Sequence, residues 1–255
     1  MNQLLALSDE QALSVQHLSL AYAHDDRLHF ALQGANLEVK RGEFVCIVGG
    51  SGSGKTTLLN ILAGLDRPTS GRAHVHGRIA FIFQEPALLP WLTASGNVKL
   101  ALELRGVRAS ERGRIASEIL GRVHLAGFEG RRPHELSGGM KQRVALARAL
   151  AQDADVLLMD EPFGSLDAIT RDLLHEELER IWRGSGLTVL FVTHNAREAV
   201  RLGDRVLVFT SRPGRVAHEV RVELARPRSL DSPELAVVAG RITDRLKLEM
   251  ARDGG

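Results

Sequence analysis

Residues 44–56 read FVCIVGGSGSGKT, an apolar run followed by a glycine-rich loop that ends in Gly54-Lys55-Thr56. The apolar run predicts a buried strand, and Leu58–Leu62 predicts a helix directly after the loop. Glycines let successive backbone N–H groups surround phosphate oxygens, and the amino end of a helix attracts anions. We expect Lys55 to reach the β- and γ-phosphates of a nucleotide and Thr56 to ligate Mg²⁺. The alternative is a glycine-rich turn that matches the pattern by chance.

The rest of the chain predicts an α/β fold around this strand. Short apolar runs recur, with helical patterns between them, as parallel strands covered on both faces require; they lie at 78–83, 156–159, 188–192 and 205–209. Residues 13–44 alternate in polarity and contain Asp25-Asp26 and Gln33-Gly34, pairs typical of turns, so we expect antiparallel strands there.

Two further segments have helical patterns. Residues 86–152 have little strand signal and predict a helical subdomain inserted in the α/β core. Ser232-Pro233-Glu234 begins a predicted C-terminal helix over about 232–252. One face of that helix is apolar and is expected to pack on the body of the domain, through Leu235, Val238, Ile242 and Leu246.

Composition narrows the class of protein. The 255 residues carry 33 basic and 31 acidic side chains, a net charge of +2, which argues against a dedicated nucleic-acid binder. The one cysteine, Cys46, excludes a disulfide framework, agrees with a reducing compartment and is expected to be a small buried hydrophobe. No apolar run approaches the roughly 18 residues of a membrane span, and Met1–Glu10 carry no secretory pattern. We expect a cytosolic protein that reaches a membrane only through a partner.

A second motif is the apolar run Val156–Met159, which ends in Asp160-Glu161. An acid at the carboxyl end of a strand beside a phosphate loop is placed to hold Mg²⁺, which predicts that role for Asp160. Neighbouring side chains on an extended chain point apart, so Glu161 is the candidate to orient or deprotonate the attacking water. Without the phosphate loop, an acid pair here would indicate a solvated turn.

A third motif is Leu136-Ser-Gly-Gly-Met-Lys-Gln-Arg143, followed by a helical pattern through Leu150. Ser137 is a candidate N-cap, and Gly138 and Gly139 leave the helix start accessible to an anion. The local chemistry of these residues is equally consistent with a helix that is capped by Ser137 and binds no anion.

Together these motifs resemble the ATP-binding subunit of ATP-binding-cassette (ABC) transporters, over nearly the whole chain. Ser137–Gly139 resembles the family signature, with Met140 where Gln is commonest, and Gln84 resembles the Q-loop glutamine. Ser165-Leu166-Asp167 matches the D-loop and His194 the switch histidine, although Asn195 follows where Asp is usual. Tyr22 resembles the aromatic residue that stacks on adenine.

The resemblance implies a P-loop NTPase (RecA-like) parallel-sheet core with an antiparallel β subdomain and a helical insert. It implies ATP and Mg²⁺ as cofactors. The catalytic residues would be Glu161, His194, Lys55 and Gln84, and the metal ligands Thr56, Gln84 and Asp160. The nucleotide would be contacted by Tyr22, Gly49, Gly50, Ser51, Gly52, Ser53, Gly54, Lys55, Thr56, Thr57, Ser137, Gly138, Gly139 and Asp167.

The same resemblance implies partners. Signature residues of one family subunit complete the phosphate-loop site of another, so a head-to-tail homodimer that encloses ATP is expected. An integral-membrane permease would dock on the helical insert near Gln84, where Leu88–Leu92 is unusually apolar for a loop. A periplasmic or surface substrate-binding protein would act indirectly, and the subunit would lie on the cytoplasmic face of the membrane.

The segments Glu85–Val98 and Pro213–Arg228 resemble the nitrate/sulfonate/taurine importer branch of the family, with departures at Ser95-Gly96 and Ala225. Three alternatives stay open. The first is an importer ATPase for another substrate. The second is a soluble ABC ATPase of repair or translation, which usually has tandem cassettes or a long coiled-coil insertion. The third is a phosphate-loop kinase or GTPase, which would lack the Leu136–Arg143 signature.

Overall fold

The computed structural model describes residues 10–24, 27–164 and 166–252. The chain divides into two compact units. The first contains the residues up to Gly77 and those from Gly186 onward, and the second is Arg78–Ser185.

The first unit is built around strand β3 (Phe44–Val48), which is buried along its whole length. Strands β7 (Thr188–Thr193) and β8 (Arg205–Phe209) pair with β3 in parallel, and β9 (Val216–Arg221) pairs antiparallel with β8. The strands predicted at 44–48, 188–192 and 205–209 are therefore confirmed. Cys46 is buried in β3, and burial raises the pKa of its thiol, as expected for a small hydrophobe.

An antiparallel sheet of β1 (Gln11–His24), β2 (Arg27–Lys40) and β4 (Ser70–Val75) belongs to the same unit. The predicted antiparallel strands are confirmed, but the turn predicted at Gln33-Gly34 is wrong. Both residues lie inside β2, where Gly34 has φ +61° and donates its N–H to the Ser19 hydroxyl at 2.9 Å. The positive φ of Gly34 therefore permits an irregularity within strand β2. The other predicted turn, Asp25-Asp26, lies outside the described residues.

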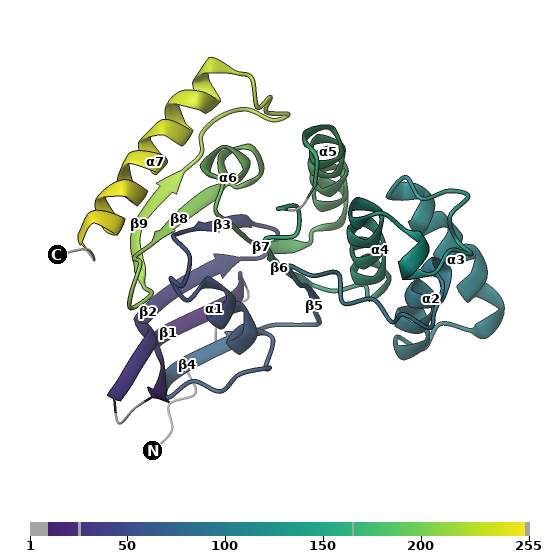
Figure 1. The fold of residues 1–255 in the computed structure, drawn as a ribbon, viewed down its shortest axis with the longest axis horizontal. Coiled ribbons are helices and arrows are strands. Elements are labelled where there is room, and N and C mark those ends of the chain that lie inside the picture. The colour runs from purple at the N-terminus through teal and green to yellow at the C-terminus, as the bar shows by residue number, and fades with distance from the viewer. Residues whose placement is uncertain (1–9, 25–26, 165, 253–255) are drawn as a thin grey trace. The chain divides into compact units, whose positions relative to one another are not determined.

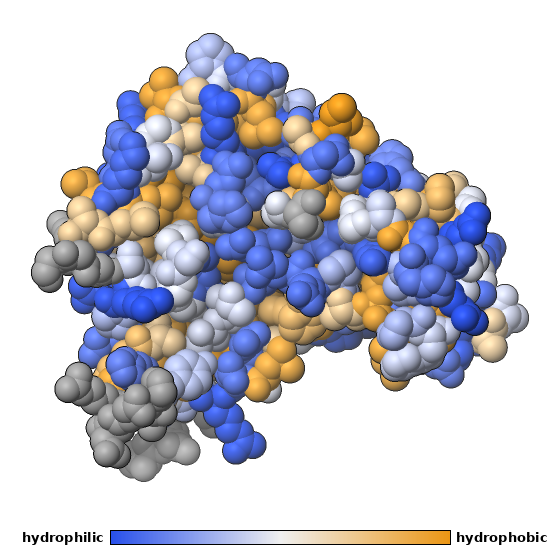
Figure 2. Space-filling model, viewed as in Figure 1, coloured by the Kyte–Doolittle hydropathy of each residue, from blue (hydrophilic) through white to orange (hydrophobic). Residues whose placement is uncertain are grey.

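Three helices complete the first unit: α1 (Lys55–Leu62), α6 (Ala196–Leu202) and α7 (Pro233–Arg252). The Ser232 hydroxyl caps α7 by accepting the Leu235 N–H at 3.1 Å. Figure 1 shows α7 beside β8 and β9, and it also contacts α6. Leu235 and Ile242 are buried on its inner face. Val237 and Leu248 are exposed on the opposite side of the helix, and Figure 2 shows hydrophobic side chains interspersed with polar ones over α7.

The second unit pairs β5 (Ile79–Ile82) in parallel with β6 (Val156–Asp160). Its helices are α2 (Ala94–Leu104), α3 (Ala109–Arg122), α4 (Gly138–Ala151) and α5 (Ala168–Ser185), with a short 3₁₀ turn at Pro133–Glu135. Helices α2, α3 and α4 pack on one another through fully buried apolar side chains, among them Val98, Leu102, Leu120 and Val144.

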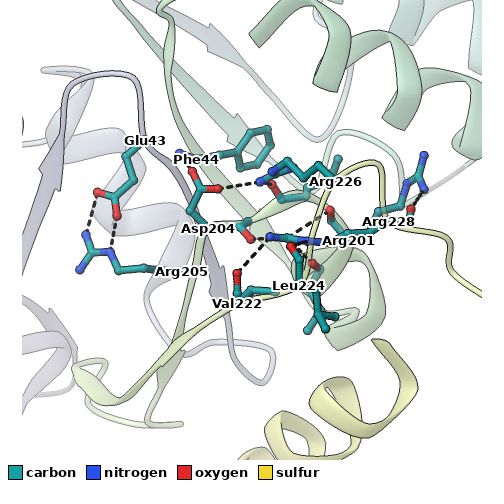
Figure 3. A network of polar contacts seen from close by, with 12 residues as sticks. Glu43, Phe44, Arg201, Asp204, Arg205, Val222, Leu224, Arg226 and Arg228 are labelled. Atoms are coloured by element: carbon teal, nitrogen blue, oxygen red, sulfur yellow. Dashed lines mark hydrogen bonds and ion pairs between the residues drawn. The ribbon is translucent and has the colours of Figure 1, made fainter. Parts of the chain in front are cut away.

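A network of arginines fixes the segment after β9 to the carboxyl end of α6 (Figure 3). The Arg228 guanidinium is buried and donates to five backbone carbonyls. The acceptors are Val200 O (2.7 Å), Arg201 O (3.4 Å), Gly203 O (2.6 Å), Val222 O (3.1 Å) and Leu224 O (3.0 Å). Arg226 donates to Asp204, whose carboxylate accepts the Phe44 N–H at 3.0 Å, so the network extends to the start of β3.

The Arg228→Met variant should be clearly less stable than the native chain. Methionine fills a similar volume but leaves the five carbonyls without this donor, and a buried polar group that loses its partner costs about 1–3 kcal/mol. We expect the free energy of unfolding to fall by about 3 kcal/mol in chemical denaturation. Arg221→Met, at an exposed arginine of β9, is the matched control. Equal stability of the two variants would show that the network does not stabilise the fold.

Within the described residues, no helix is both long and apolar enough to cross a membrane.

Candidate functional site

The glycine-rich loop lies between the end of β3 and the start of α1. Gly54 is the N-cap of α1 with φ +80°, and a Cβ there would lie 2.4 Å from the Ala31 carbonyl oxygen. Glycine is therefore required on two grounds, the left-handed backbone and the close approach of β2. This geometry directs the start of α1 at the loop, as a phosphate-binding loop requires.

Lys55 lies folded into this loop. Its side chain is buried, and its ammonium donates to Gly49 O at 2.9 Å, Gly50 O at 2.8 Å and the Ser53 hydroxyl at 3.2 Å. Ser51, Gly52 and Thr56 are exposed, and Thr57 is half-buried. The loop thus surrounds a fixed positive charge and leaves its outer rim open to a ligand.

His194 follows β7, which pairs with β3 so that Thr193 lies opposite Val48. The histidine and Gly49 therefore leave neighbouring parallel strands at the same edge, where α/β folds bind ligands. The segment around His194 is held by local hydrogen bonds. The Asn195 N–H donates to Thr193 Oγ1 at 3.0 Å, and the Asn195 side chain caps α6 by accepting the Arg197 N–H at 2.9 Å.

Glu198 is a buried residue of α6 that the sequence motifs did not indicate. The Thr193 hydroxyl donates to its carboxylate, which ties the residue before His194 to the first turn of α6. No pattern in the chain marks this contact, because it depends on where the helix folds back on the strand end.

Tyr22 lies on β1 opposite His29 of β2, with its side chain half exposed. The first unit therefore contains Tyr22, the residues Gly49–Thr57 and His194.

The other predicted site residues belong to the second unit. Asp160 is the last residue of β6 and is buried, and Glu161 follows with φ +43°. A left-handed backbone is strained for glutamate, and such strain is common at functional sites. Because Ile82 pairs with Met159, Gln84 leaves β5 at the same edge as Asp160 and Glu161.

Ser137 is the N-cap of α4, as predicted, since its hydroxyl accepts the Met140 N–H at 3.2 Å. Ser137 and Gly138 are exposed, and a Cβ at Gly138 would meet no atom within 4 Å. A Cβ at Gly139 would approach Leu166 Cδ2 at 3.3 Å, so the signature segment and the D-loop segment are in contact. The helix start is therefore open to an anion at Gly138 and closed by packing at Gly139.

Gln142 connects the signature helix to the strand end beside Gln84. This buried residue of α4 donates from Nε2 to the Phe83 carbonyl oxygen at 3.4 Å. Gln142 belongs to the third motif, but the motif did not indicate this contact, because Phe83 is distant in the chain.

Asp167 accepts the Thr170 N–H at 2.9 Å, and hydrogen bonds from the Thr170 hydroxyl and backbone lower the pKa of its carboxyl group. The residue is therefore a stable anion at the start of α5. Ser165, the first D-loop residue, lies outside the described residues.

Comparison with known proteins places this geometry in context. The family model described as "ABC transporter" matches residues 32–164. The aliphatic sulfonates import ATP-binding protein SsuB 1 of Mesorhizobium japonicum is 49% identical over 84% of this chain and 82% of its own length. The nitrate import ATP-binding protein NrtD of Synechocystis sp. is 48% identical over 76% of each chain.

Among solved structures, the dimeric post-hydrolysis state of the ATP-binding cassette MJ0796, bound to ADP and Pi, matches with a TM-score of 0.78. It is 34% identical and covers 84% of this chain and 100% of its own. That fold is a P-loop NTPase core with an antiparallel β subdomain and helices, and it is the fold predicted for this chain.

Proposed function

Because the chain belongs to the ABC transporter family of ATP-binding proteins, we propose that it is the ATP-hydrolysing subunit of an importer. The cargo we propose is a small anion such as nitrate, a sulfonate or taurine, which crosses the membrane through a separate permease. The observation that carries the proposal is the closed loop around Lys55, with His194 leaving the neighbouring strand. The named activities of the similar sulfonate and nitrate proteins support the anion class.

In this proposal the chain's residues divide the work at the nucleotide. Lys55 and the loop N–H groups hold the β- and γ-phosphates, and Tyr22 stacks on adenine. Glu161 accepts the proton of the attacking water, and His194 and Gln84 contact the γ-phosphate and that water. ATP binding is a property of the family. The assignment of these roles to individual residues is our proposal.

The donors present fit Mg²⁺. In the described part of the chain no three His, Cys, Asp or Glu side chains gather to form a metal cage. Mg²⁺ suits that arrangement, since it binds through one or two protein oxygens together with substrate phosphates and water. Thr56, Asp160 and Gln84 would be the protein ligands, and the ion would neutralise charge that develops on the phosphates.

We also propose a head-to-tail homodimer. Ser137 and Gly138 are exposed at an uncovered helix start, which supports contact with phosphates bound to a second copy. Each bound ATP would then be shared by the loop of one copy and Ser137–Gly139 of the other. Water cleaves the bond between the β- and γ-phosphates, and departure of the released phosphate removes bridging charge and shifts the population toward the open dimer.

A groove on the second unit is the proposed permease contact. A cavity of about 640 Å³ is lined by apolar side chains of α2 and by basic side chains, among them Leu89, Leu100, Leu104, Arg105 and Arg148. In the loop that contains Leu89, Trp91 is 67% exposed. Buried Asn97 fixes this loop by accepting the Leu89 N–H at 2.9 Å and donating to Thr93 O at 3.0 Å. A rigid apolar surface with a basic rim suits an amphipathic helix of the permease.

We further propose that residues 86–152 form the helical subdomain and that the helix over about 232–252 is a C-terminal addition to the core. The subunit would lie on the cytoplasmic face of the membrane, held there by the permease. A substrate-binding protein outside would contact the permease only.

The docking prediction concerns Leu88 and Trp91. The Leu88→Ser and Trp91→Ala variants remove apolar side chains from the loop that contributes Leu89 to the groove, so we expect loss of most permease retained in co-purification, with the ATPase rate of the free subunit unchanged. Leu65→Ser, at an exposed leucine of the first unit, is the matched control. Undiminished association of the Leu88 and Trp91 variants would exclude this surface.

The proposed function is tested by reconstitution in liposomes with the permease. We expect phosphate release from ATP to rise when the permease is present, and the anion to accumulate only with ATP. A rate of phosphate release that is the same with and without the permease would favour a soluble ABC ATPase. Uptake of a different solute would show that the proposed cargo is wrong.

A further inference from the structure

The turn between β8 and β9, residues Thr210–Arg215, lies against the phosphate loop. The turn is closed by its own hydrogen bonds. The Thr210 N–H donates to Arg215 O at 3.0 Å, and the Arg215 N–H donates to Thr210 Oγ1 at 3.1 Å. The tip residues Ser211–Gly214 are therefore presented in a defined conformation.

The turn is also attached to β2 and to the loop. The Gly214 N–H donates to Ala31 O at 3.0 Å, and Gly214 O accepts the Gln33 N–H at 3.2 Å. A Cβ at Gly214 would lie 2.1 Å from Ser53 O, so the backbones of turn and loop touch and only glycine fits. The turn, β2 and the phosphate loop form one packed body within the first unit.

Arg212 at the tip of this turn lies against Gly52 of the loop. A Cβ at Gly52 would lie 2.5 Å from Arg212 Nη2, 3.1 Å from Nε and 3.2 Å from Cζ. Gly52 is exposed and has φ +74°, so it belongs to the open rim of the loop. The Nε/Nη2 edge of the guanidinium therefore faces this rim of the loop.

The chemistry of the two groups points to one kind of ligand. A guanidinium carries a permanent positive charge and five N–H donors with no acceptor, and a phosphate loop presents backbone N–H donors. An anion with several oxygens can accept hydrogen bonds from both kinds of donor at once. Arginine binds phosphate through two parallel N–H···O bonds, which fits this position at the rim.

We infer that Arg212 is a further nucleotide-binding residue, whose guanidinium binds the phosphate chain of the nucleotide held by residues 49–56. This inference rests on the proposed function, because it requires a nucleotide in the loop. Arg212 adds a second cation to the site, on the outer face of the loop, while Lys55 lies inside it.

The test compares three full-length variants: Arg212→Ala, Arg212→Lys and, as matched control, Arg215→Ala, an exposed arginine of the same turn. Affinities for ATP, ADP and adenosine are measured by displacement of a fluorescent ATP analogue with Mg²⁺ present. Because Arg212→Ala would lose a hydrogen bond between charged groups, we expect this variant to bind ATP and ADP about tenfold more weakly than the native chain. We expect unchanged adenosine binding, an intermediate loss for Arg212→Lys and native affinities for Arg215→Ala.

Native ATP affinity of Arg212→Ala would overturn the inference. An equal loss for ATP and adenosine would also overturn it, because that result shows that Arg212 only maintains the loop. Melting temperatures without nucleotide confirm that the variants are folded. If the native chain does not bind ATP, or if Lys55→Ala binds it equally well, the proposed function fails and not the Arg212 assignment alone.

Discussion

The Glu161→Gln variant should bind ATP with near-native affinity and hydrolyse it about 10²–10⁴-fold more slowly, the range for loss of a positioned general base. The reason is chemical, because the amide keeps the shape of the side chain but does not accept a proton from water. Glu161 is also strained at φ +43°, directly after the buried Asp160, so its position is set by the fold. Phosphate release and nucleotide binding, measured on the same preparation, separate the two properties.

The control for this prediction is Glu85→Gln, at an exposed acid that follows Gln84. It removes one carboxylate from the same unit and should hydrolyse ATP at the native rate. A Glu161→Gln variant as fast as this control would remove Glu161 from the role of base, and loss of ATP binding would show that the glutamate serves binding instead.

The Lys55→Ala variant should lose ATP binding and, with it, hydrolysis. The native ammonium is fixed by Gly49 O, Gly50 O and the Ser53 hydroxyl, so the substitution removes both the charge for the phosphates and the group around which the loop closes. Because a charge-assisted contact to phosphate is worth about 1.5–3 kcal/mol and the loop geometry is lost as well, we expect affinity to fall at least about 100-fold.

Lys99→Ala, at an exposed lysine of α2, is the control and should bind ATP like the native chain. Binding is measured by calorimetry, and circular dichroism shows whether the loop variant is folded. Retained nucleotide affinity in Lys55→Ala would contradict the assignment of residues 49–56 as the phosphate loop.

The sequence predicted the central strands well because a strand covered on both faces is apolar throughout, and Phe44–Val48 is such a run. It did not mark β4 or β9 as strands. Ser70–Val75 is largely exposed and Val216–Arg221 is half-buried, so neither has a hydrophobic pattern that separates it from a loop. The error at Gln33-Gly34 has a similar cause, because a glycine with positive φ is typical of a turn and of an irregular strand alike.

The candidate site also has parts that the sequence predicted and parts that it did not. Motifs that are contiguous in the chain, such as residues 49–56, Asp160-Glu161 and Ser137–Gly139, were visible at once. The contacts of Glu198, Gln142 and Arg212 were not visible, because only folding brings their partners near: Thr193, Phe83 and Gly52, respectively. Arg212 lies 160 positions from Gly52 in the chain, and no local pattern connects them.

The central claim is that two copies of this chain enclose ATP between them, and light scattering on Glu161→Gln tests it most directly. In this variant hydrolysis does not reopen the dimer, so added ATP should convert particles of 27.9 kDa into particles of twice that mass, with Ser137→Arg abolishing the change. The specific ATPase rate of the native chain should rise with its concentration over the same range. A Glu161→Gln variant that remains a monomer with ATP bound, beside a native chain whose specific rate is independent of concentration, would contradict the account.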